Sequence, residues 1–74
     1  MPPLPVISGK ILIATLQKAG FMITRQRGSH VQLRHRDGRL ATIPMHGNQD
    51  LPRGTLRGIL RDIDLSPEDF IKLI

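Results

Sequence analysis

The middle of the chain carries the pattern of an antiparallel β-hairpin, and this pattern constrains the fold more than any other feature. From His30 to His35, the apolar residues Val31 and Leu33 alternate with polar ones, which is the period of a strand with one buried face. Asp37-Gly38 follows and is a frequent turn sequence, because both residue types tolerate positive φ. A second strand is expected over residues 40–44, where a proline ends it or places it at a sheet edge.

The segments on either side predict a third strand and three helices. A strand is expected from Phe21 to about Gln26, with either of its faces buried, and Arg27-Gly28 supplies the turn into the next strand. A helix is expected from about Gly9 to Ala19, and another from about Arg53 to Ile63. Ser66-Pro67 opens a short terminal helix. The apolar positions expected to face the core are Ile11, Leu12, Leu16 and Ala19 in the first helix, Leu56, Ile59, Leu60 and Ile63 in the second, and Phe70, Leu73 and Ile74 in the third.

The predicted order α-β-β-β-α, followed by a short extra C-terminal helix, indicates an α+β fold. The simplest way to bury these apolar stripes is a three-stranded antiparallel sheet with the helices on one face. This architecture resembles the double-stranded RNA-binding fold, and it leaves the other sheet face open. His30, Gln32 and Arg34 are expected on that open face.

The first residues predict an extended arm rather than part of a helix. Prolines at positions 2, 3 and 5 cannot lie in a helix interior, so we expect a proline-rich arm over 1–7 and one domain over 8–74. A domain of 74 residues has no room for an enclosed cofactor cavity beside its core. Function is therefore expected on an open surface, without a cofactor.

The charge balance favours an anionic partner. Eleven Lys and Arg residues against six Asp and Glu give a formal net charge of +5, which points to nucleic acid before membrane, although a merely soluble basic domain has the same balance. The only aromatic residues are Phe21 and Phe70, both expected in the core, so no platform for stacking bases is predicted. No cysteine and no membrane-length apolar run occur, and an intracellular, cytoplasmic protein is expected.

Three histidines are the candidates for acid–base chemistry. His30 is the best of them because it is presented to solvent beside basic and amide side chains, although a surface histidine without function fits the same pattern. His35 is expected to have a structural role, and His46 lies in a loop where it either anchors the loop or approaches a substrate. Their spacings match no zinc template, so no metal site is predicted. The arginine stripe on the second long helix is either a solvated face or a phosphate contact: Arg53, Arg57 and Arg61.

An ordered set of short motifs, from about Val6 to Phe70, resembles the HicA (YcfA-like) toxin family. The motifs are Ser8-Gly9-Lys10, Lys18-Ala19-Gly20-Phe21, Arg25-Gln26-Arg27-Gly28-Ser29-His30, Arg34-His35 with Asp37-Gly38-Arg39, Ile43-Pro44-Met45-His46-Gly47-Asn48, and Leu51 to Leu60 with Gly54-Thr55-Leu56. The resemblance implies a ribonuclease that cleaves messenger RNA and arrests translation, and a HicB-type antitoxin that neutralises it.

The family's catalytic histidine follows Gly-Ser on the second strand, and the matching residue here is His30. Many members carry a second histidine directly after it, where this chain has Val31, so a second proton-transfer group stays unassigned. We predict metal-independent cleavage with His30 as general acid and base. The residues expected to bind RNA are Arg25, Arg27, Ser29, Gln32 and Arg34. The alternative is a non-catalytic module that only binds RNA.

Overall fold

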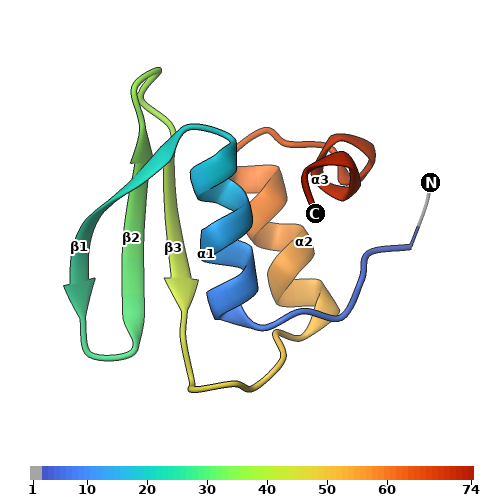
Figure 1. Ribbon diagram of the computed structural model, residues 1–74, viewed down its shortest axis with the longest axis horizontal. Coiled ribbons are helices and arrows are strands. Elements are labelled where there is room, and N and C mark those ends of the chain that lie inside the picture. Colours follow the sequence, from blue (N-terminus) through green and yellow to red (C-terminus); the bar gives the residue numbers. More distant parts are fainter. Residues whose placement is uncertain (1–2) are drawn as a thin grey trace.

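The computed structural model describes residues 3–74 and has the predicted α+β architecture (Figure 1). Along the chain, its elements are α1 (Gly9–Lys18), β1 (Phe21–Arg27), β2 (His30–His35), β3 (Leu40–Pro44), α2 (Arg53–Asp62) and α3 (Pro67–Leu73). The strands form one antiparallel sheet in the order β1-β2-β3, and α1 and α2 pack beside β3 (Figure 1). The predicted three-stranded sheet with helices on one face is confirmed.

The first helix begins and ends as its sequence predicts. The Ser8 hydroxyl accepts a hydrogen bond from the Ile11 amide at 3.3 Å, which satisfies a free N–H of the first turn. After α1, Gly20 adopts a φ of +97°, a left-handed conformation that favours glycine. The expected apolar face was partly wrong, because Ile11 is exposed and Ile13 is buried instead. Thr15 is also buried, and its hydroxyl donates to the Ile11 carbonyl at 2.8 Å.

The remaining helices follow their predicted caps and stripes. Ile63 follows the last residue of α2 as its C-cap, and all four residues of the predicted stripe are buried: Leu56, Ile59, Leu60 and Ile63. The Ser66 hydroxyl accepts from the Asp69 amide at 3.1 Å and caps α3, with Pro67 in the first turn. Phe70 is fully buried, whereas Ile74 is exposed and lies outside the helix, contrary to its expected core position.

The core lies between the sheet and the helices and also includes part of the N-terminal segment. Its largest fully buried side chains are Phe70, Leu12, Leu16, Leu33, Ile43, Leu56, Leu60 and Ile63. Residues 3–7 form neither helix nor strand, and Met1 and Pro2, the start of the predicted arm, lie outside the described residues. Leu4 and Ile7 are buried in the core, and the Ile7 carbonyl accepts a hydrogen bond from the Leu51 amide at 2.8 Å. The segment therefore contributes to packing, which the proline pattern did not predict.

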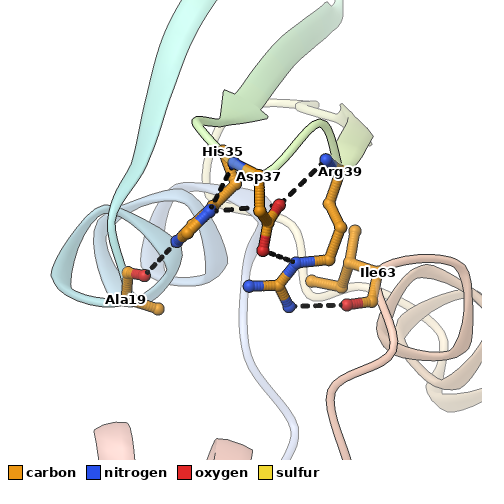
Figure 2. Close-up of polar contacts among 5 residues, drawn as sticks. All are labelled: Ala19, His35, Asp37, Arg39 and Ile63. Atoms are coloured by element: carbon orange, nitrogen blue, oxygen red, sulfur yellow. Dashed lines mark hydrogen bonds and ion pairs between the residues drawn. The ribbon is translucent and has the colours of Figure 1, made fainter.

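A polar network joins the β2–β3 turn to the ends of both long helices (Figure 2). The Asp37 amide donates to His35 Nδ1 at 3.2 Å, so the proton of the neutral ring lies on Nε2, which donates to the Ala19 carbonyl at 3.1 Å. Asp37 accepts from the backbone N–H and the guanidinium of Arg39, and that guanidinium also donates to the Ile63 carbonyl at 2.8 Å. The Arg39 hydrogen bonds hold the pKa of the Asp37 carboxyl below its ordinary value of 3.8.

The turn within this network differs in one detail from its prediction. Gly38 has a φ of +100°, whereas Asp37 does not adopt positive φ. The His35 amide donates to the Arg39 carbonyl at 2.9 Å, and this bond closes a loop of three residues, 36–38. A three-residue loop requires the left-handed conformation only at its last residue, which is why glycine alone meets the requirement here.

Candidate functional site

The open face of the sheet presents two polar rows at the end where β2 begins and β3 ends (lower end in Figure 1). In the first row, His30 on β2 lies between Arg27 on β1 and Pro44 on β3. In the second row, Gln32 lies between Arg25 and Thr42. Residues paired across neighbouring strands share a face, so the side chains of each row are neighbours.

A β-bulge brings the two arginines to the face of His30. Phe21 and Ile23 pair with residues of the helix-covered face of β2, and strict alternation would place Arg25 and Arg27 on that face as well. The register shifts by one residue between Ile23 and Arg25, so Arg25 pairs with Gln32 instead. At the bulge, the Thr24 hydroxyl donates to the Gln32 carbonyl at 3.3 Å. The extra residue is therefore what gathers both guanidinium groups around the imidazole.

These side chains line a shallow hollow of about 170 Å³, which we call the His30 hollow: Arg25, Arg27, His30, Gln32 and Thr42. Four of the five were predicted as site residues. The lining holds two permanent cations, two neutral hydrogen-bonding groups and one imidazole, and no carboxylate belongs to it. Such a lining attracts an anion, and histidine is the residue type in it that most often serves as a general acid or base.

The side chain of His30 is exposed, and Arg25 and Arg27 are exposed beside it. A ligand therefore reaches the imidazole from solvent without any movement of the backbone. An exposed imidazole can act as a general acid or base, and neighbouring guanidinium groups can stabilise negative charge on a bound phosphate. The arrangement can thus combine proton transfer with anion binding at one point of the sheet.

Two predicted RNA-binding residues lie outside the His30 hollow. Ser29 is in the β1–β2 turn, half-buried, and its carbonyl accepts a hydrogen bond from the Met45 amide at 2.6 Å. Arg34 shares the open face, but it is four residues along β2 from His30, a distance of about 13 Å in a strand. Its cross-strand neighbours are Met22 and Leu40.

The other two histidines have different surroundings. The side chain of His35 is 17% exposed, and both ring nitrogens are bonded within the polar network of the β2–β3 turn. Its ring also meets the Phe21 ring edge to face, with centroids 5.1 Å apart. His46 is exposed in the loop after β3, and its carbonyl accepts from the Gln49 amide at 3.1 Å. His35 is thus a packing residue, and His46 borders a separate hollow with Pro44.

Thr42 is the lining residue that sequence reasoning missed. It occupies an exposed position of β3 between the buried Ala41 and Ile43, so the alternation of that strand already placed it opposite the core. The signal for its place beside Gln32 was the hairpin register, which follows from the length of the 36–38 loop.

Among residues 3–74, no group of three or more histidine, aspartate or glutamate side chains is arranged to hold a metal ion. None of the helices in this part of the chain is long and apolar enough to cross a membrane.

Comparison with known proteins identifies the family. A search of curated proteins finds no significant match. The sequence profile of the HicA toxin of bacterial toxin–antitoxin systems matches residues 9–65, which span α1, the whole sheet and α2. The profile covers well over half of the 74 residues and includes every residue that lines the His30 hollow. This chain belongs to the HicA toxin family of toxin–antitoxin systems.

Proposed function

We propose that this toxin is a metal-independent endoribonuclease that cleaves messenger RNA and blocks translation, with His30 as its general acid and base. The observation that supports this most is the His30 hollow, where an accessible imidazole lies with two arginines and without a carboxylate. Arginine matches phosphate geometry, and a cationic lining favours a polyanionic substrate. Translation of messenger RNA takes place in the cytoplasm, which is therefore the proposed site of action.

In the proposed reaction, neutral His30 removes the proton of a ribose 2′-hydroxyl, and that oxygen attacks the adjacent phosphorus. The bond from phosphorus to the 5′ oxygen of the next nucleotide breaks, and this oxygen takes the proton back from His30. The products are a 2′,3′-cyclic phosphate and a 5′-hydroxyl end, and no co-reactant is needed. One histidine thus acts as base and then as acid, which fits a hollow whose lining holds a single imidazole and no carboxylate.

Arg25 and Arg27 are proposed to stabilise the negative charge that develops on the phosphate oxygens. They line the same hollow as His30, whereas Arg34, another residue expected to bind RNA, is about 13 Å farther along β2. Gln32 and Thr42 supply hydrogen-bonding groups that can hold the ribose or phosphate in place. For Ser29 and Arg34, we propose RNA contacts outside the reacting position.

The proposed protein partner is a HicB-type antitoxin. Membership of a toxin–antitoxin family implies an antitoxin partner, and its HicB type is part of the proposal. We propose that it covers the open sheet face and buries His30, because a stable interface of about 800 Å² per partner takes a large share of so small a surface. A complex that leaves His30 exposed would contradict direct occlusion of the site.

A second function, RNA binding without cleavage, is favoured by the lack of a second titratable group in the lining of the His30 hollow. The two functions are distinguished by incubating the protein with RNA in EDTA. Cleavage should persist, leave 2′,3′-cyclic phosphate ends and fail on a substrate with a 2′-deoxy nucleotide at the cut site. Intact RNA would favour the binding module, and activity that requires an added divalent ion would overturn the metal-free mechanism.

A further inference from the structure

The opposite end of the sheet differs chemically from the His30 hollow. There the register places Arg34 between Met22 on β1 and Leu40 on β3. Met22 is 70% exposed, the most of any large apolar residue in the described part of the chain, and Leu40 is 42% exposed. The proposed RNA chemistry uses neither of them. An apolar patch of this kind marks a surface for a partner of mixed apolar and polar character.

A groove beside β1 continues this patch around the edge of the sheet. It has a volume of about 600 Å³ and lies among the last residues of α1, the first half of β1 and the end of β2. Met22 and Ile23 provide its apolar lining, and Ile23 is 48% exposed. No acidic side chain lines the groove. Three cations do: Lys18, Arg34 and Arg36. We call this surface the β1 groove.

The outer edge of β1 is available for pairing. In the described sheet, β1 is an edge strand and pairs only with β2 (Figure 1). Proteins commonly protect such edges with charged residues and bulges. In β1, the bulge and both arginines protect only the second half, whereas residues 21–23 carry no charge. The first half is therefore the part of β1 that can accept an additional strand.

We propose that the β1 groove binds an extended protein segment in which acidic and apolar residues alternate, added to the sheet beside residues 21–24. The three cations would pair with its carboxylates, and Met22 and Ile23 would pack against its apolar side chains on the two faces of the strand. A second copy of this chain is disfavoured because each copy carries a net charge of +5. RNA is disfavoured because exposed methionine and isoleucine provide no stacking surface for bases.

The proposal deepens the partnership of the toxin with its antitoxin and rests on the proposed function only for the identity of that partner. A strand docked in the β1 groove would place the body of the antitoxin beside the open face. The antitoxin, anchored by this strand, could then cover the His30 hollow. The strand in the β1 groove would provide affinity, and a separate contact over the His30 hollow would block the site.

The test uses the full chain, labelled with ¹⁵N, and a synthetic peptide that alternates glutamate and isoleucine. The peptide should shift the backbone amide signals of residues 18–24 and 34–36. Met22→Glu should weaken its binding about ten-fold, because it places like charges together and removes an apolar contact. Ile11→Glu is the matched control, since Ile11 is 48% exposed on α1, away from the groove, and this variant should bind like the parent. A peptide with lysine in place of glutamate should not bind.

Three outcomes would overturn the proposal: no amide shifts, shifts centred on the His30 hollow, or equal shifts at residues 18–24 when a short RNA replaces the peptide, which would make the first half of β1 a nucleic-acid surface. Peptide binding does not depend on catalysis, so the proposal and the ribonuclease function fail separately. Met22→Glu should retain the RNA cleavage of the parent protein, and a loss of cleavage in the folded variant would contradict the division of the sheet into two surfaces.

Discussion

Replacing His35 should destabilise the protein more than replacing either of the other histidines. In His35→Ala, the Ala19 carbonyl and the Asp37 amide lose hydrogen bonds of 3.1 and 3.2 Å. Each such bond contributes about 1 kcal/mol net. The edge-to-face contact with Phe21 is also lost and contributes about 1 kcal/mol more. We expect the free energy of unfolding to fall by about 3 kcal/mol, which lowers the melting temperature of a domain of this size by about 12 to 24 °C.

The assay is thermal and urea unfolding followed by far-UV circular dichroism, because the chain has no tryptophan or tyrosine for fluorescence. His30→Ala and His46→Ala are the matched controls. Both remove an exposed imidazole, and each should change the free energy of unfolding by less than about 0.5 kcal/mol. If His35→Ala has the same free energy of unfolding as these two controls, the polar network does not hold the β2–β3 turn to α1. The structural role given to His35 would then be refuted.

Other perturbations test neighbouring parts of the account. Gly20→Ala should destabilise by about 2 kcal/mol or more, because φ is +97° and the added Cβ would lie 2.9 Å from His35 Nε2; an unchanged melting temperature would contradict this. The lowered pKa of Asp37 stabilises the folded state above pH 3.8, and this contribution is lost as the pH falls through the lower folded-state pKa. In Asp37→Asn, the free energy of unfolding should therefore decrease less as the pH falls into the acid range. The same decrease as in the parent protein would count against the Arg39 contacts. Arg27→Gln should reduce the slope of log affinity for RNA against log salt by about 0.7 to 0.9, whereas an unchanged slope would mean that Arg27 contacts no phosphate.

The elements were predictable because each has a local signal. Ser8 and Ser66 mark helix starts through their side-chain hydrogen bonds, and the alternation of β2 separates its buried from its exposed residues. Ile11 was placed wrongly because the four consecutive apolar residues 11–14 leave the helix face undecided. The buried face includes Ile13 and Thr15, and the Thr15 hydroxyl can be buried there because it bonds within α1.

The composition of the His30 hollow could be predicted only in part. The position of His30 follows from one strand, so alternation was sufficient. The side on which Arg25 and Arg27 lie depends on the bulge at Thr24, and a bulge is a property of two paired strands rather than of one sequence segment. Arg34 was grouped with His30 because alternation gives them the same strand face, and Ser29 because it precedes His30 in the Gly-Ser-His motif. Only cross-strand neighbours determine which residues share the hollow.

The measurement that tests the central proposal most directly is RNA cleavage by His30→Ala beside the parent protein, with both shown to be folded by circular dichroism. The exposed side chain makes little contribution to packing, so the variant should keep the parent's melting temperature and still bind RNA through its arginines. We predict that cleavage is lost, because the lining of the hollow holds no other imidazole and no carboxylate to transfer the proton. Undiminished cleavage by the folded variant would contradict the assignment of His30 as general acid and base.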